Sequence, residues 1–234
     1  MKRQDIKSLL YEALGKRVAE VREQVVARKL KSLEVGSYFV HKKPFYISQL
    51  ASAKKSSIDG FYGAIKDKDA AYRFGTKDLK EFSYWAWRAC GIVGLQMVLK
   101  TVHGNSFDHK TIELIKEGYE LGGYDTKIDT GWFHKSIAKL AEKYKLKAEL
   151  KKFVPASEIA LIISKGSYVL ASTESLTGGH FLLMYGFKMN SKKELSGFWI
   201  HDSNDFEDAG EGKYISKNDF KNLSTRRIIS LKKK

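Results

Sequence analysis

The chain has 234 residues, with 42 Lys and Arg against 27 Asp and Glu, so its formal net charge is +15. Apolar residues make up 43% of the chain, which is enough for a buried core and excludes wholesale disorder. The single cysteine excludes an internal disulfide and a cysteine-rich metal site.

The first 34 residues form an N-terminal unit in which apolar residues recur every three or four positions. These residues are Ile6, Leu10, Leu14, Val18, Val21, Val25 and Leu30. The spacing predicts one long amphipathic helix, and we expect its apolar stripe to dock on the rest of the chain. A dimerising coiled coil and a membrane-lying helix are the alternatives. We find no secretory signal and no apolar run that could span a bilayer, so we expect a soluble, cytoplasmic protein.

Residues 35–83 form a variable segment of extended and turn-rich pieces, and the pattern becomes regular in a domain over residues 84–234. Helices are predicted over residues 89–102, 108–119, 132–145 and 157–166, the last three capped by Asp108, Thr130 and Ser157. Strands are predicted over residues 168–173, 180–188, 197–201 and 226–231. Because the helices come first and the strands cluster last, the sequence predicts an α+β fold with an antiparallel sheet.

The lone cysteine, Cys90, opens the first buried helix of that domain. A thiol there meets the positive end of the helix dipole and unpaired backbone N–H groups, and both favour the nucleophilic thiolate. Gly91 lets a substrate approach the backbone closely, so the Cys90 N–H could point at a developing oxyanion. A buried structural cysteine is the alternative interpretation.

A cysteine nucleophile needs a general base, and His180 is the best placed of the six histidines. It begins a predicted strand behind Gly178 and Gly179, which leave space for a substrate backbone. The next strand ends at Asp202, and antiparallel pairing of the two strands brings that end beside His180. Asp202 can therefore hold the second ring nitrogen and orient the base. Asn204 is the alternative for this orienting role.

The order of these motifs resembles the papain-like double-glycine leader peptidases (peptidase family C thirty-nine). CG begins a helix, GGH begins a strand, and an aspartate closes the following strand. The resemblance implies a papain-like cysteine peptidase fold with Cys90, His180 and Asp202 at the triad positions. The family carries a glutamine six residues before the cysteine as an oxyanion donor, whereas this chain has Tyr84. We expect the Tyr84 hydroxyl, or the Gln49 amide, to take its place.

The resemblance implies hydrolysis of a peptide bond through a thioester intermediate, with a peptide or protein as the substrate. We expect Gly91, Gly178, Gly179 and Trp132 to line the substrate cleft. A thiol acyltransferase or amidase on the same scaffold and an inactive peptide-binding scaffold are the alternatives.

No cofactor or metal is expected for this site. An acidic patch consists of Asp205, Glu207, Asp208 and Glu211, but its spacing does not fit an EF-hand, and a solvated loop is the simpler interpretation. The lysines are spread along the chain, so we expect at most weak, non-specific binding of nucleic acid. The oligomeric state does not follow from the sequence.

Overall fold

A computed structural model describes residues 3–60, 62–129, 131–175, 178–206 and 208–234 of the chain. The helices are α1 (Arg3–Leu30), α2 (Lys68–Phe74), α3 (Leu79–Ala86), α4 (Cys90–His103), α5 (Thr111–Glu120), α6 (His134–Lys143), α7 (Ala156–Ser164) and α8 (Lys217–Leu223). The strands are β1 (Gly36–Phe39), β2 (Leu146–Lys151), β3 (Tyr168–Ser175), β4 (Gly178–Met189), β5 (Leu195–Asp202), β6 (Lys213–Ser216) and β7 (Ser224–Lys233).

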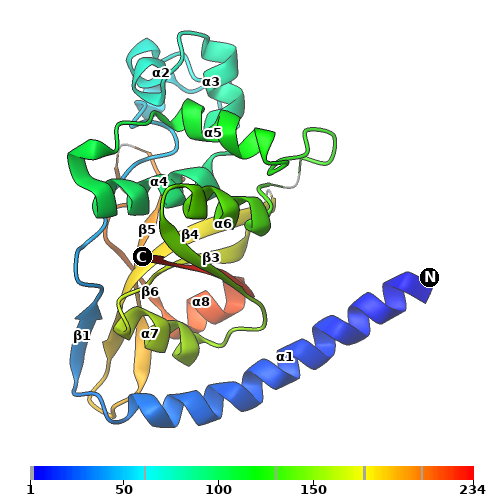
Figure 1. Cartoon of the computed structure of the whole chain (residues 1–234), viewed down its shortest axis with the longest axis vertical. Coiled ribbons are helices and arrows are strands. Elements are labelled where there is room, and N and C mark those ends of the chain that lie inside the picture. The colour runs from blue at the N-terminus through cyan, green and yellow to red at the C-terminus, as the bar shows by residue number, and fades with distance from the viewer. Residues whose placement is uncertain (1–2, 61, 130, 176–177, 207) are drawn as a thin grey trace.

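All the strands belong to one antiparallel sheet with the order β2-β7-β3-β4-β5-β6, and β1 pairs with β4. Helices α2, α3 and α5 gather at one end of the molecule, and α4 and α6 lie between them and the sheet (Figure 1). Strand β4 is central, and residues 181–187 are buried without alternation because both faces of the sheet are covered there. The predicted α+β fold with an antiparallel sheet is confirmed.

Helix α4 lies against the sheet because two of its residues have no side chain. A Cβ added at Gly91 would lie 2.7 Å from Ile137 of α6 and 3.2 Å from Phe181 of β4, and one added at Gly94 would lie 2.6 Å from Leu170 of β3. Real Cβ atoms essentially never come as close as 2.7 Å to other heavy atoms, so both positions require glycine or a shift of the neighbour. This close packing sets how near the start of α4 comes to the strands below it.

The segment 35–83 is built into the same core as the rest of the chain. Strand β1 extends the sheet by pairing with the end of β4, and Leu50, Ile65 and Phe74 are buried in the shared core. The predicted boundary at residue 84 falls inside α3. This segment therefore packs as part of the same unit as residues 84–234.

Helix α1 docks on the molecule through a different face from the one its apolar periodicity suggests. Ala19 is buried, and Gly15 is in close contact with the ring of Phe153. Two ion pairs reinforce this face, Glu12 with Arg227 at 2.7 Å and Glu23 with Lys217 at 2.6 Å.

The predicted apolar stripe of α1 is mostly on the outside. Leu30 is buried, but the other described members of the stripe are exposed, namely Leu10, Leu14, Val18, Val21 and Val25. The side chain of Ile6 lies outside the described part of the chain. The expectation that this stripe docks on its own domain is wrong, because small residues and charge pairs make the contact in its place. None of the described helices is long and apolar enough to cross a membrane.

Several predicted boundaries also differ from the structure. Strands β2 and β6 and helix α8 were not predicted, since their sequences are polar and largely exposed. Lys110 and Pro155 occupy the N-cap positions of α5 and α7, each two residues from the cap predicted at Asp108 or Ser157. Thr130, predicted to cap the next helix, lies outside the described residues.

Candidate active site

Cys90 is the first residue of α4 and is a free, buried thiol. The Val93 N–H donates to the Ala89 carbonyl at 2.8 Å, which closes the first turn of the helix. The N–H groups of Cys90 and Gly91 precede that bond and have no acceptor within the helix. They are therefore available to bind negative charge that develops near the thiol.

His180 and Asp202 meet through the pairing of β4 with β5. Asp202 lies opposite Leu182 in this antiparallel pair, two residues from His180 on the same face of the sheet. The His180 Nε2–H donates to Asp202 Oδ1 at 2.7 Å. The Cys90 side chain is a second hydrogen-bond partner of His180, which leaves Nδ1 of the ring for the thiol. The structure thus brings together the three residues predicted from the sequence.

The charges of this group support one another. Burial alone lowers the pKa of His180, but the hydrogen bonds to Asp202 and Cys90 and the attraction of their charges outweigh burial and raise it to about 10. Burial raises the pKa of Asp202, whereas the hydrogen bond to His180 and its charge pull that pKa below the ordinary value. The hydrogen bonds and charges of Asp202 and Cys90 thus favour the protonated form of the His180 ring.

The Asp202 turn is clamped by the segment before α2. The Tyr46 hydroxyl donates to the Asp202 carbonyl at 3.1 Å, and the Gln49 N–H donates to the Ser203 carbonyl at 2.9 Å. The Gln49 side chain donates to Asn204 Oδ1 at 2.8 Å and accepts from the Ser203 hydroxyl at 3.0 Å. We call Tyr46 and Gln49 the clamp. The sequence pattern gave no sign of it, because these contacts join residues more than 150 positions apart.

The clamp shows what two of the predicted residues contact. Gln49 is almost completely buried, and its side-chain amide donates to Asn204, so it supports the turn behind Asp202. Its role as an oxyanion donor stays a prediction. Asn204 does not take over the orienting role. Its backbone N–H donates to Asp202 Oδ1 at 3.0 Å and so stabilises the negative charge of that carboxylate. Its side chain accepts a hydrogen bond from Gln49.

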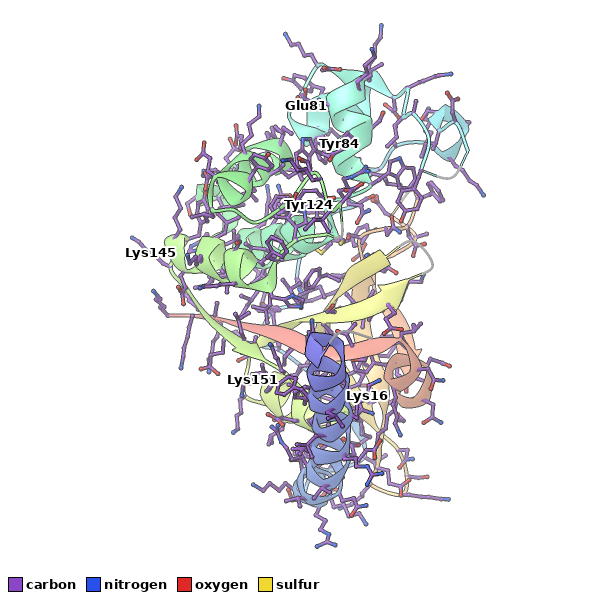
Figure 2. All side chains as sticks on the ribbon, turned by 90° about the vertical axis from the view of Figure 1, so that its right-hand side faces the viewer. Lys16, Glu81, Tyr84, Tyr124, Lys145 and Lys151 are labelled. Atoms are coloured by element: carbon purple, nitrogen blue, oxygen red, sulfur yellow. The ribbon has the colours of Figure 1, made fainter. Side chains whose placement is uncertain are left out.

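Tyr84 is held in a polar cluster before Cys90. The Arg88 guanidinium lies 4.1 Å from the centre of the Tyr84 ring and donates to the Tyr84 carbonyl at 3.0 Å. It also forms a bidentate pair with Asp129, at 2.8 and 2.6 Å, and Asp129 accepts a hydrogen bond from Tyr124. Arg88 lowers the pKa of Asp129 to about 2. Figure 2 shows Tyr84 and Tyr124 in the same helical end of the molecule.

Two of the four residues predicted to line the cleft, Trp132 and Gly91, are buried inside the molecule. Trp132 is buried, and its indole N–H donates to the Arg88 carbonyl at 2.9 Å, so it braces the approach to Cys90. Gly91 serves the packing of α4. Gly179 faces open space, with no heavy atom within 4 Å of an added Cβ, and Gly178 pairs with Ser175 at the start of β4.

The acidic patch is engaged in pairs with other side chains. Asp205 pairs with Lys213 at 2.5 Å, Glu211 pairs with Lys43 at 2.8 Å, and Asp208 accepts from Ser52 at 2.6 Å. Glu207 lies outside the described residues. Within the described ranges, no group of three or more His, Cys, Asp or Glu side chains could hold a metal ion.

Solved structures similar to this chain include peptidase domains. The peptidase domain of Streptococcus ComA, a bi-functional ABC transporter involved in a quorum sensing pathway, is 16% identical over 63% of this chain and 93% of that one, with a TM-score of 0.46. A double glycine motif protease from an AMS/PCAT transporter, in complex with the leader peptide, is 16% identical over 63% and 86%, with a TM-score of 0.44. No curated protein matches the sequence. Residues 76–228, more than half of the chain, match the Peptidase_C39 like family, and the chain belongs to that family.

Proposed function

We propose that the protein is a cysteine peptidase in which Cys90 is the nucleophile, His180 the general acid and base, and Asp202 the orienting group. One observation carries this proposal. A single imidazole is hydrogen-bonded to the only cysteine of the chain and to a carboxylate whose turn is clamped from behind. The cation on His180 favours the thiolate form of Cys90, which is the form that attacks a carbonyl.

The reaction proceeds in two balanced steps. Cys90 Sγ attacks the peptide carbonyl carbon, the C–N bond breaks, and the His180 proton passes to the leaving amine, which leaves a thioester. Neutral His180 then takes a proton from water, the resulting hydroxide attacks the thioester carbon, and the C–S bond breaks to return the thiolate and a carboxylic acid. Asp202 stays ionised throughout and keeps Nε2–H in place.

The oxyanion of both steps is bound at the start of α4 by the Cys90 N–H, with the helix dipole behind it. The Tyr84 hydroxyl is the alternative donor, because Arg88 lies over the face of its ring and leaves the hydroxyl open to a ligand. Loss of a working oxyanion donor typically lowers turnover by about 10²–10³-fold. We therefore expect Tyr84→Phe to retain turnover within about tenfold, and a loss of 10²-fold or more would return the hydroxyl to the oxyanion role.

The substrate is a peptide with small residues beside the scissile bond. Gly179 has open space beside the base, so a slim backbone can pass there. The similarity to a double glycine motif protease in complex with a leader peptide suggests testing double-glycine substrates first.

The decisive test is peptide cleavage followed by mass spectrometry, using peptides with a Gly-Gly pair and a broad peptide library. The unmodified protein should cut, and Cys90→Ala and His180→Ala should lose all detectable turnover. His41 is an exposed histidine outside the site, so His41→Ala is the matched control and should cut normally.

Alkylation by iodoacetamide tests the site without any substrate. At pH 6 the unmodified protein should react at least about tenfold faster than His180→Ala, because the imidazolium favours the thiolate. Equal rates would contradict the proposed pair. Fast alkylation without cleavage, together with amide formation from an added amine, would assign the site to acyl transfer, and alkylation without either reaction would assign it to an inactive scaffold.

A further inference from the structure

Helix α1 carries an apolar seam that faces away from the molecule. The seam consists of Leu14, Val18, Val21 and Val25, and every member is exposed by 46% or more of its surface. Figure 1 shows α1 as a long arm at the side of the molecule, with the N-terminus far from the sheet. Exposed apolar surface that is contiguous, as in this seam, marks an interaction site more often than scattered exposed residues do.

The spacing of the seam is that of a coiled coil. Its members follow one another at intervals of four, three and four residues, which is the alternation of a and d positions in a heptad. Val18 and Val25 take a positions and Leu14 takes a d position, a choice that favours pairing of two helices. The stripe is narrow and contains no Trp or Phe, whereas helices that lie in a bilayer surface carry a wide apolar face with such anchors.

The charges of α1 are divided between its two faces. The acidic residues Glu12, Glu20 and Glu23 all point to the molecule, where they pair with Arg227, Arg226 and Lys217. The e and g positions that flank the seam carry Arg17, Arg22 and Lys29, and Arg28 takes the d position after Val25. Arg22 pairs with Glu158, but among the described residues the other three side chains form no ion pair. The seam is therefore bordered by cations.

The cations that border the seam favour a partner helix with acidic flanks over one with basic flanks. In a parallel pair, a g position of one helix faces an e position of the other, so a second copy would set Arg17 against Arg22. Like charges at these positions oppose pairing. A helix with Glu or Asp at its flanking positions would meet cations on both sides of the same apolar seam.

We propose that the seam of α1 docks an amphipathic helix of another polypeptide, with apolar a and d positions and acidic flanks. α1 is already held as a helix by its contacts with Phe153 and Arg227, so only the partner has to become ordered on binding. The surface is independent of the thiol chemistry, and Cys90→Ala should bind the partner as the unmodified protein does.

Two synthetic helices serve as probes for the full-length protein, measured by fluorescence anisotropy. Both carry Val at a and Leu at d; one has Glu at every e and g position and the other has Lys. The Glu peptide should bind at least about tenfold more tightly than the Lys peptide. This preference should shrink as salt is added, because the flanking charges are exposed and screened.

Substitutions on both faces make the test specific. Leu14→Ser with Val18→Ser should weaken binding of the Glu peptide by more than about tenfold, since two apolar contacts are lost. Ala13→Ser is the matched control, at an exposed position off the seam, and should bind normally. Arg17→Glu with Lys29→Glu should reverse the preference to the Lys peptide, an outcome that misfolding cannot produce.

Three results would overturn the proposal. The first is equal binding, or no binding, of the two peptides. The second is a dimer in analytical ultracentrifugation that the Leu14→Ser, Val18→Ser protein does not form, which would assign the seam to a second copy. The third is co-sedimentation with phosphatidylglycerol vesicles that depends on the same two residues when neither peptide is preferred.

Discussion

Helices α4 and α1 use their apolar residues in opposite ways. In α4, apolar side chains and two glycines press the helix onto the sheet, and Cys90 is placed by that contact. In α1, a small-residue face and ion pairs make the contact, and the apolar seam faces outward. A period of three to four residues thus predicts a helix and a stripe, but the stripe turns to the core only where the core offers apolar surface.

The largest difference in stability between the two helices should appear when a leucine is truncated in each. Leu95 in α4 is fully buried, whereas Leu14 in α1 is 64% exposed. Leu95→Ala should lower the free energy of unfolding by about 2–5 kcal/mol, because it leaves a cavity. Leu14→Ala should change it by less than about 0.5 kcal/mol. Urea denaturation measures both, and similar losses would mean that the seam is covered by this chain itself.

Substitution of Gly91 in α4 gives the next largest effect. Gly91→Ala should destabilise the protein by about 1–3 kcal/mol, since the new Cβ meets Ile137 and Phe181. Gly179→Ala is the control, in open space, and should leave the midpoint of urea denaturation unchanged. An unshifted midpoint for Gly91→Ala would mean that α4 can lift off the sheet, and the distance from Cys90 to His180 would no longer be fixed by packing.

A pH titration tests His134, whose ring is near Arg227, the residue that pairs with Glu12 of α1. Burial, then the charges of Arg227 and Lys152, lower the pKa of His134 from 6.5 to about 4. The unfolded chain therefore binds this proton first, so the free energy of unfolding falls as the pH drops from 6.5 towards 4 and levels off below.

His134→Gln should remove on the order of 1–2 kcal/mol of this acid-induced loss, less than the full shift implies because the ring is partly exposed. The measurement is the difference between the two stability profiles, since carboxylates titrate in the same window in both proteins. Parallel profiles would show that His134 titrates normally.

The smallest effect is expected where α1 meets the sheet. Arg227→Ala removes the pair with Glu12, and its partly exposed position limits the loss to about 0.2–1 kcal/mol. The loss should diminish in high salt. Arg17→Ala, which removes a cation bordering the seam, should change stability even less. A loss above 2 kcal/mol for Arg227→Ala would show that ion pairs hold α1 more firmly than exposed pairs usually do.

The positions of His180 and Asp202 could be predicted from the sequence because the two residues lie on neighbouring strands. His180 and Asp202 lie on strands joined by one short loop, so antiparallel pairing alone brings them together. The clamp could not be predicted, because Gln49 is far from Ser203 and Asn204 in the sequence and these residues meet only in the folded chain. Strand β2 could not be predicted from its own sequence. It is an edge strand, it is largely exposed, and it lacks a buried apolar run.

The clamp also bears on how the chain can be cut or recombined. Tyr46 and Gln49 precede residue 76, where the match to the family begins, yet they hold the turn that carries Asp202. A chimera that exchanges only residues 76–228 with a relative would transfer Cys90, His180 and Asp202 but leave behind the clamp that holds the Asp202 turn. The smallest unit that carries both the three residues and the clamp therefore starts upstream of the family match, at β1, because that strand and the clamp lie on one continuous stretch of chain.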